Sequence, residues 1–278
     1  MPQHEPSPRA RRLGLRLARL RKTARLPQEE AGKPLRYDLR KMSRIEKGQI
    51  PDYAGLTALL DVYGVPVNEW EPYVRLWEQA KDKGWWHGLG LTDAGYISLE
   101  HHASTARVYA LTAVPDLLQT PDYTRLALTD PITGRPHRNT AAEVTARAQR
   151  QQRLTTHPPL ALHAIIPAHA ITPQHQTPDS VLDGQLRHLA DQARLPNITV
   201  QILPTTVGAH QAPFTILSFP DADDIDTVYT HHAFGSVITD NPDRVTTATH
   251  RFRHLAELAL SEPDSRALID HQHYLATG

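Results

Sequence analysis

The sequence predicts an α+β protein, in which an all-α N-terminal domain of five helices precedes an α+β domain. Three observations carry this prediction. Apolar residues recur at helical spacing through the first 83 residues, short period-two runs follow between about residues 160 and 230, and helical spacing returns afterwards. The second domain is expected to hold a small, mainly antiparallel sheet flanked by helices. The expected boundaries are a disordered tail at 1–8, a helical domain at 9–83, a glycine-rich hinge at 84–95 and the α+β domain at 96–278.

The composition excludes several classes of protein. With 278 residues, 40% hydrophobic and 22% charged, the chain is long enough for two modest domains and unlike a disordered chain. It has no cysteine, which excludes disulfides, thiolate nucleophiles and Cys-ligated metal sites. No apolar run approaches the roughly 20 residues that cross a bilayer, and residues 1–10 lack a signal-peptide core. We expect a soluble, cytoplasmic protein without membrane association.

The charges are unevenly distributed along the chain. Residues 1–50 contain 14 Lys or Arg and 5 Asp or Glu, a balance of +9, so the remaining residues, with 16 against 25, carry −9. A compact basic segment on an acidic body indicates a polyanionic partner, most obviously nucleic acid. A solvated charged face is the alternative explanation.

Several helices are predicted in the N-terminal domain from apolar spacing and capping residues. The first has one apolar face formed by Leu13, Leu17, Leu20 and Ala24. A later helix follows Pro51-Asp52 and ends at Gly64. The next is predicted to open at Asn68, with Glu71 as its capping-box partner.

Between these helices, the segment Leu26–Glu46 has the layout of a helix-turn-helix, whose second helix lies in the DNA major groove. Pro27–Glu30 opens the first helix, and Lys33–Tyr37 is the predicted turn. Asp38 caps a second helix that runs over Leu39–Glu46.

The faces of the second helix predict its contacts with DNA. Met42 and Ile45 are expected to face the core, so the base-contacting residues are predicted to be Leu39, Arg40 and Ser43. Arg40 could bind guanine in bidentate fashion, whereas Leu39 could make only apolar contact. The residues predicted to contact phosphates are Gln28, Lys41, Arg44, Arg16 and Arg19.

The elements of the second domain are predicted from the same signals. Helices are expected from Tyr96 to about Tyr109, after Pro121, from Thr140, after Thr177-Pro178, at Pro242–Leu260 and at Glu262–Tyr274 with Ser261 as cap. Strands are expected at Leu160–Ile166, Ile198–Leu203, Phe214–Phe219 and Ile225–Thr230. On the helix from Thr140, we expect Arg147, Arg150 and Arg153 to form a solvated edge.

Leu13–Gly48 resembles the helix-turn-helix domain of the XRE (lambda-repressor-like) regulators. The similarity lies in Lys41–Gly48, which is similar to the end of their recognition helix, in Gln28–Glu30 and in Asp61–Val65. The chain departs from the family where Ala31–Pro34 replaces a regular helical run. Pro34 costs roughly 3 kcal/mol in a helix interior and Gly32 about 1 kcal/mol, so we expect a shortened helix.

The remainder is similar to the effector domain of actinobacterial XRE regulators of the Scr1-type, antitoxin-like group. The resemblance is carried by Val114–Tyr123, Leu195–Pro204, Gly208–His210 and Pro213–Leu217. It implies an effector pocket, for which the candidate residues are Leu118, Gln119, Tyr123, His210 and Tyr229. The chain has Asp116 where that group has a glycine.

Seventeen histidines raise the question of a metal site. On a strand, His231 and His232 would point to opposite faces, and on a helix His271 and His273 would lie about 200° apart, so neither pair chelates alone. No metal site and no cofactor are predicted. No catalytic residues are predicted either, because no nucleophile, base and orienting group can be assembled from spacing.

The sequence therefore predicts a transcriptional regulator that binds double-stranded DNA as a homodimer. Its effector would be a small molecule or, as the resemblance implies, a small partner protein encoded nearby. Two alternatives stay open. One is a helix-turn-helix scaffold repurposed as a small-molecule-binding protein or enzyme, with a pocket between Val114–Tyr123 and the sheet; the other is a protein-interaction module that titrates a partner.

Overall fold

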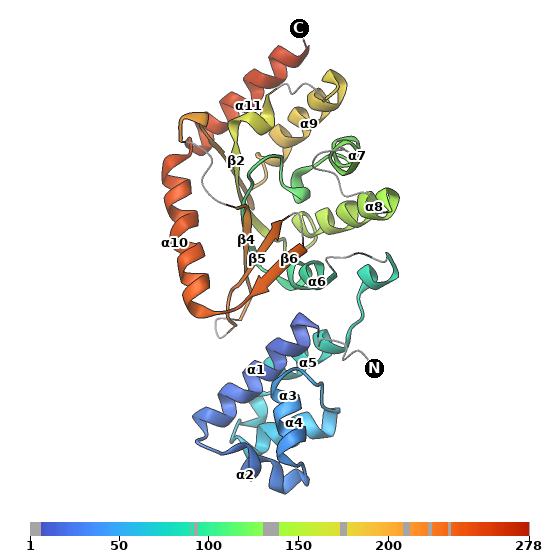
Figure 1. The fold of residues 1–278 in the computed structure, drawn as a ribbon, viewed down its shortest axis with the longest axis vertical. Coiled ribbons are helices and arrows are strands. Elements are labelled where there is room, and N and C mark those ends of the chain that lie inside the picture. The colour runs from blue at the N-terminus through green and yellow to red at the C-terminus, as the bar shows by residue number, and fades with distance from the viewer. Residues whose placement is uncertain are drawn as a thin grey trace. The chain divides into compact units, whose positions relative to one another are not determined.

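The computed structural model describes residues 7–89, 91, 94–129, 139–172, 177–207, 212–221, 224–232 and 235–277. The chain divides into two compact units, Met1–His87 and Gly88–Gly278. Helices come first and an α+β unit follows, so the predicted fold class is confirmed (Figure 1). The finer domain boundaries drawn from the sequence stay predictions.

Unit 1 is all-α. Its helices are α1 (Pro8–Thr23), α2 (Gln28–Gly32), α3 (Leu39–Glu46), α4 (Tyr53–Val62) and α5 (Glu71–Lys81), with 3₁₀ turns η1 (Lys33–Leu35), η2 (Val67–Glu69) and, after α5, η3 (Trp85–Leu89). Leu13, Leu17 and Leu20 of α1 and Met42 and Ile45 of α3 share one core, whereas Ala24 lies beyond α1 and outside this core. Leu17, Met42 and Leu56 are among its fully buried members.

The cap predicted at Asp38 is present in unit 1, since its carboxylate accepts a hydrogen bond from the Lys41 N–H at 2.6 Å. Asp52, just before α4, accepts one from the Gly55 N–H at 2.7 Å in the same way. The start predicted at Asn68 is wrong, because α5 begins at Glu71. Pro72 has no N–H to donate to the carbonyl of Asn68, so a helix from that residue would lack a bond in its first turn.

A close approach between α1 and α3 depends on Gly14. A Cβ atom added at Gly14 would lie 2.6 Å from the carbonyl oxygens of both Ile45 and Glu46. No side chain fits there unless the backbone shifts. Gly14 therefore sets how closely the end of α3 sits against α1.

Unit 2 is built on one six-stranded sheet. The strands are β1 (Thr105–Tyr109), β2 (Ala161–Pro167), β3 (Ile198–Leu203), β4 (Phe214–Ser218), β5 (Thr227–His232) and β6 (Gly235–Thr239). Their order is β3-β2-β1-β4-β5-β6. β1, β2 and β3 are parallel, and β4, β5 and β6 continue antiparallel, so the sheet is mixed.

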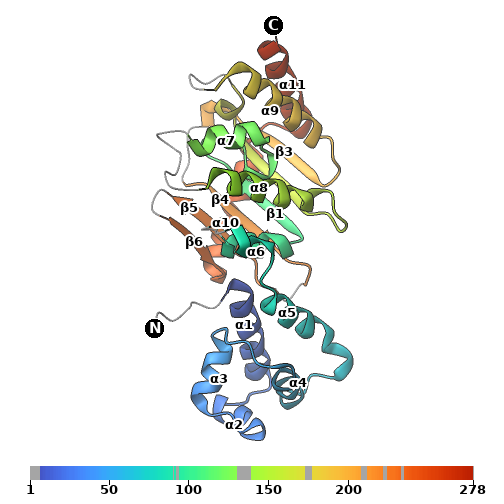
Figure 2. The ribbon, with the colours of Figure 1, turned by 90° about the vertical axis from the view of Figure 1, so that its right-hand side faces the viewer.

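Helices cover both faces of this sheet. They are α6 (Ala94–His102), α7 (Pro121–Thr129), α8 (Thr140–Gln151), α9 (Asp179–Gln192), α10 (Pro242–Leu258) and α11 (Glu262–Thr277), with 3₁₀ turns η4 (Asp116–Leu118), η5 (Gln152–Leu154), η6 (Ala168–Ile171) and η7 (Thr205–Val207). α6, α7, α8 and α9 lie on one face and α10 on the other (Figures 1 and 2). α11 packs against α9 and β3.

The outer edge of β3 is closed by the C-terminal segment. The Ile202 N–H donates to Ser265 Oγ at 2.9 Å, and the Leu260 N–H donates to the Ile202 carbonyl at 2.9 Å. The Ser265 hydroxyl and the Leu260 N–H therefore pair with both backbone groups of Ile202. These bonds satisfy edge groups that would otherwise be open to pairing.

Two strands contradict the sequence prediction. The expected helix from Tyr96 to Tyr109 ends at His102, and Thr105–Tyr109 is the central strand β1. β6 had no counterpart in the prediction. Both are five residues long, so neither offers enough alternation to separate a strand from a helix or a loop.

Candidate functional site

The predicted helix-turn-helix is present in unit 1. α2 ends at Gly32, and η1 follows, so the shortening expected from Pro34 is confirmed. Arg36 then takes the left-handed conformation (φ 56°), which reverses the chain before Asp38 caps α3. The turn and the bounds of the second helix match the prediction.

The face of α3 predicted to read DNA lies at the protein surface. Leu39 is 55% exposed and Arg40 is exposed, whereas Ser43 is half-buried. On the opposite face, Met42 and Ile45 are buried in the core of unit 1. α3 can therefore present Leu39 and Arg40 to a groove without losing its support, but their contact with bases stays a prediction.

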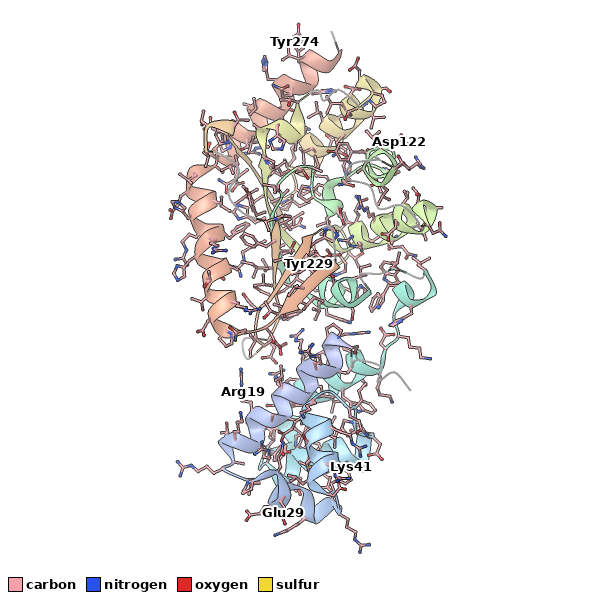
Figure 3. All side chains as sticks on the ribbon, viewed as in Figure 1. Arg19, Glu29, Lys41, Asp122, Tyr229 and Tyr274 are labelled. Carbon is pink, nitrogen blue, oxygen red and sulfur yellow. The ribbon has the colours of Figure 1, made fainter. Side chains whose placement is uncertain are left out.

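Most residues predicted to contact phosphates lie around α3 and α1. Arg44 is exposed on α3, and Arg19 and Lys41 lie on α1 and α3 (Figure 3). Lys41 Nζ is 3.4 Å from the centre of the Tyr37 ring, and the Arg16 guanidinium is 5.1 Å from that of Tyr73. These cation–π contacts restrict the two side chains yet keep their positive charge.

Gln28, also predicted to contact a phosphate, forms a hydrogen bond within unit 1. Its side-chain Nε2 donates to Glu46 Oε2 at 2.7 Å. Arg21 donates to the same carboxylate from Nε at 2.5 Å and from Nη2 at 3.0 Å. As placed, Gln28 braces the end of α3 from α2, and a phosphate contact by this residue stays a prediction.

Some of the N-terminal positive charge is not available to a polyanion. Arg9 is buried, donates to the Asp82 carbonyl and stacks at 5.1 Å on Trp86, which is only 1% exposed. Burial lowers the pKa of Arg9, and the Asp82 carboxylate opposes this shift. Arg12 is buried as well. The charge balance of the sequence therefore overstates the basic surface of unit 1.

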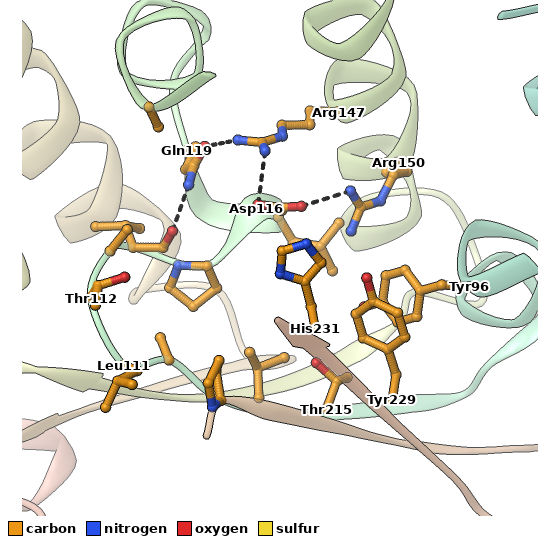
Figure 4. A pocket seen from close by; sticks show the side chains of 18 of the residues that line it. Tyr96, Leu111, Thr112, Asp116, Gln119, Arg147, Arg150, Thr215, Tyr229 and His231 are labelled. Atoms are coloured by element: carbon orange, nitrogen blue, oxygen red, sulfur yellow. Dashed lines mark hydrogen bonds and ion pairs between the residues drawn. The ribbon is translucent and has the colours of Figure 1, made fainter. Parts of the chain in front are cut away.

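Unit 2 contains a cavity of about 330 Å³ beside the carboxyl end of β1 (Figure 4). Its wall has an apolar part from β1, from the segment after it and from β4, and a polar part from η4 and α8. The residues that line the cavity include Tyr96, Val108, Leu111, Thr112, Ala113, Pro115, Asp116, Gln119, Glu143, Arg147, Arg150, Phe214, Thr215, Tyr229 and His231.

Asp116 links two arginines of α8. Its Oδ1 lies 3.2 Å from Arg147 Nη2, and its Oδ2 lies 3.1 Å from Arg150 Nη1. Gln119 accepts a hydrogen bond from Arg147 and donates to the Val114 carbonyl at 2.7 Å. These bonds attach the segment after β1 to α8 across the cavity.

Arg150 also forms a buried ion pair with Glu100 of α6. Its Nε and Nη2 donate to the two carboxylate oxygens at 2.7 and 2.9 Å, and Tyr96 Oη donates to Glu100 Oε2 at 2.7 Å. Burial works to lower the pKa of Arg150, but Glu100 and Asp116 together outweigh it and raise this pKa well above its ordinary value. Burial also raises the pKa of Tyr96, so the phenol stays a donor.

The solvated edge predicted for α8 is therefore wrong. The Arg150 side chain is 8% exposed and that of Arg147 is 13% exposed. Arg153 is held by the carbonyls of Ala103 and Pro158. Arg153 lies in η5, beyond the end of α8, and helical spacing could not show that Arg147 and Arg150 meet Glu100 and Asp116, which come from distant segments.

Two of the residues predicted for an effector pocket line this cavity. Gln119 is in the polar wall, and Tyr229 stacks on Tyr96 with ring centres 4.1 Å apart. Leu118 and Tyr123 are instead buried in the core and are not part of the wall. His210 lies outside the described residues. That the cavity binds an effector stays a prediction.

Four residues of the wall were not predicted from the sequence, namely Tyr96, Arg147, Arg150 and His231. The one signal for them was Asp116, an acid in place of the glycine that the resemblance leads one to expect. Asp116 is only partly buried, its side chain 43% exposed, and two arginines one helical turn apart pair with it. Nothing in the spacing identified which arginines these were.

Within the described segments, no group of three or more His, Asp or Glu residues could hold a metal ion. No described helix is both long enough and apolar enough to span a bilayer.

Comparison with known families gives two matches. Residues 94–271, well over half of the chain, match the family described as Domain of unknown function (DUF5753). Residues 12–72 match a family described as Helix-turn-helix domain. No curated protein and no solved structure matches the chain.

Proposed function

This chain belongs to the DUF5753 family and carries the helix-turn-helix domain of a DNA-binding regulator, and from that premise we propose a sequence-specific transcriptional regulator of the XRE type. It acts on double-stranded DNA in the cytoplasm. α3 enters the major groove, where Arg40 and Leu39 meet base edges. Ser43 lies deeper on the same helix.

The exposed face of α3 carries this proposal. Leu39 is a large apolar residue left 55% exposed at the start of a capped helix whose other face is buried. Arg40 and Arg44 are exposed on the same helix. An apolar residue on the same helix as two exposed arginines suits a groove that offers both acceptor atoms and thymine methyl groups.

The protein binds as a homodimer, because a single helix-turn-helix covers one half-site and two-fold dimers read two half-sites about 34–36 Å apart. Unit 2 binds the effector. The cavity beside β1 supports a small-molecule effector. A small partner protein in an antitoxin-like arrangement rests on the resemblance of the sequence alone.

The same cavity supports one alternative, in which unit 2 is a small-molecule-binding protein or an enzyme and unit 1 no longer binds DNA. Buried arginines beside a hollow of about 330 Å³ would serve either case. The two differ in whether α3 selects a DNA sequence. The titrating-module alternative has no such observation behind it.

Selection of bound fragments from random duplex DNA, at two salt concentrations, tests the proposal. The full chain should enrich an inverted repeat, and its affinity should fall as salt rises. A variant with Arg40, Lys41 and Arg44 all changed to Ala should enrich nothing. Arg125→Ala, which removes an exposed positive charge from α7 in unit 2, should behave as wild type. Enrichment of no motif by the wild-type chain would refute sequence-specific binding.

A further inference from the structure

The cavity lies where the strand pairing of the sheet changes from parallel to antiparallel. β1 has the parallel strand β2 on one side and the antiparallel strand β4 on the other. Tyr109, the last residue of β1, pairs with Phe214, the first residue of β4, and both line the cavity. In open sheets, ligands bind outside the carboxyl ends of parallel strands, where the strand order diverges.

The polar side of the cavity is rich in hydrogen-bond donors. Arg147 Nε and His231 Nε2 are buried and have no hydrogen-bond partner within the described part of the chain. An arginine Nε can only donate, whereas His231 Nε2 donates when the proton is on that nitrogen. Buried polar atoms without partners are uncommon in folded proteins, and beside a cavity the Arg147 Nε–H indicates an acceptor atom brought by a ligand.

The other side of the cavity is apolar. Val108 of β1 and Phe214 of β4 come from the sheet, and Leu111, Ala113 and Pro115 come from the segment after β1. The stacked rings of Tyr96 and Tyr229 form a further part of the wall. A ligand that satisfies both sides has an apolar body and an oxygen-bearing head, and Figure 4 shows these two parts of the wall facing each other.

The charge of the head is limited by two acids in the same wall. Asp116 and Glu143 line the cavity together with Arg147 and Arg150. Asp116 and Gln119 occupy two nitrogens of Arg147 and leave its Nε–H without a partner among the described residues. All three nitrogens of Arg150 bond Glu100 or Asp116, so that only one N–H of each Nη remains. A single carboxylate can use these few groups, whereas a phosphate ester brings a second negative charge against the two acids.

We propose that this cavity binds a small monocarboxylate with an apolar or aromatic body, held by Arg147, Arg150 and His231 at its head and by the wall of β1 and β4 along its body. The inference rests on the proposed function only in naming the effector of unit 2. The carboxylate of the ligand accepts hydrogen bonds from the N–H groups that Asp116, Gln119 and Glu100 leave free.

Calorimetric titration of the full chain without DNA tests this assignment. Phenylacetate and octanoate are the probes, and phenylacetamide and phenyl phosphate are their neutral and dianionic counterparts. Each carboxylate should bind at one site, about tenfold or more tighter than the amide, as expected for the loss of a charged hydrogen bond. The proposal would be overturned if neither carboxylate bound, or if the amide or the phosphate bound more tightly than phenylacetate.

Three variants locate the binding. Arg147→Leu should weaken phenylacetate about tenfold or more, and Arg125→Leu should leave it unchanged because Arg125 is exposed and, among the described residues, forms its ion pair with exposed Asp122 in α7. Arg147→Leu could disturb the bonds to Asp116 and Gln119. Thr112→Trp therefore serves as a second variant, since it fills the cavity from an exposed wall position and removes no buried pair. Undiminished binding in Thr112→Trp would place the ligand elsewhere and overturn the proposal.

The outcome is independent of the test for DNA binding. A chain that selects a DNA motif but binds neither carboxylate loses this assignment and keeps the proposed function. A chain that binds carboxylates but selects no DNA motif keeps the assignment and loses the regulator.

Discussion

The Glu46 carboxylate, at the last residue of α3, is bound by two nitrogens of Arg21 from α1, Nε at 2.5 Å and Nη2 at 3.0 Å. Both side chains are about nine-tenths buried. Gln28 of α2 adds a third donor to the same carboxylate. One acid therefore joins α3 to α1 and to α2.

Glu46→Gln should destabilise unit 1 by about 3 kcal/mol, because it leaves the Arg21 guanidinium buried without its counter-charge. Tryptophan fluorescence during urea unfolding measures this directly, since all four tryptophans lie in residues 70–86 of unit 1. Glu71→Gln breaks an exposed i,i+4 pair with Arg75 and should cost less than about 1 kcal/mol. Equal losses in the two variants would mean that the Arg21–Glu46 pair does not hold α3.

Arg40→Ala should weaken binding to the selected operator by about 1–3 kcal/mol and relax the preference at one base pair. Arg44→Ala should weaken binding to operator and random DNA alike and reduce the salt dependence by about one phosphate contact. Competition titrations on both DNAs at two salt concentrations separate these effects. If Arg40→Ala lost equal affinity for operator and random DNA, its role in base recognition would be refuted.

Gly14→Ala should destabilise unit 1, although alanine is the better helix former by about 1 kcal/mol. The added Cβ would meet backbone oxygens of Ile45 and Glu46 at 2.6 Å, and overpacking of this kind typically costs about 1–3 kcal/mol. Gly184→Ala on α9 is the matched control. Its Cβ would meet nothing within 4 Å, so that variant should gain up to about 1 kcal/mol. Urea unfolding followed by circular dichroism would show the two changes, and stabilisation by Gly14→Ala would contradict the close packing of α1 and α3.

Unit 1 was largely predictable because its elements are defined by local signals. Asp38 and Asp52 cap the helices that their positions indicated, and Pro34 shortens α2 as its missing N–H requires. The error at Asn68 has the same local character, since Pro72 was the deciding residue and was present in the sequence. Arg21 and Glu46, by contrast, are 25 residues apart, and spacing alone does not pair them.

Unit 2 was less predictable because its site is made by long-range contacts. Arg150 lies 50 residues from Glu100 and 34 from Asp116. No helical or strand period reports such pairs. The strand β1 was hidden for a similar reason, since its five residues are stabilised by pairing with β2 and β4 on either side and not by their own pattern.

Arg150→Leu should be the most destabilising single change in unit 2, by about 3–5 kcal/mol, because Glu100 would stay buried at 1% exposure without a counter-charge. Circular dichroism during thermal and urea unfolding measures the loss. The double variant Arg150→Leu/Glu100→Leu should recover much of it, since neither charge then remains uncompensated. Failure of the double variant to recover stability would show that the cost comes from packing and not from the ion pair.

Acidification should destabilise unit 2 through His163 of β2. Its ring lies edge-on to Phe252 with centres 4.9 Å apart, and burial lowers the pKa of His163 below its ordinary value of 6.5. The Gln201 amide nitrogen donates to the carbonyls of Ala256 and Leu260, so its oxygen faces His163 Nε2 at 2.7 Å and accepts from it. The neutral ring is thereby held with its proton on Nε2.

Proton linkage determines whether acid raises or lowers the free energy of unfolding. As pH falls through 6.5 the unfolded chain binds a proton at this histidine before the folded one does. The contribution of His163 to the free energy of unfolding is therefore complete above about pH 6.5 and declines below it, toward the lower pKa of the folded state. His188, whose pKa burial also lowers, adds to this decline. Urea unfolding at a series of pH values between neutral and mildly acidic should show the loss in the wild-type chain. His163→Gln, which can donate to Gln201 but does not titrate, should show a smaller one, whereas His250→Gln at an exposed position of α10 should match the wild type. An unchanged decline in His163→Gln would assign the acid sensitivity to other groups.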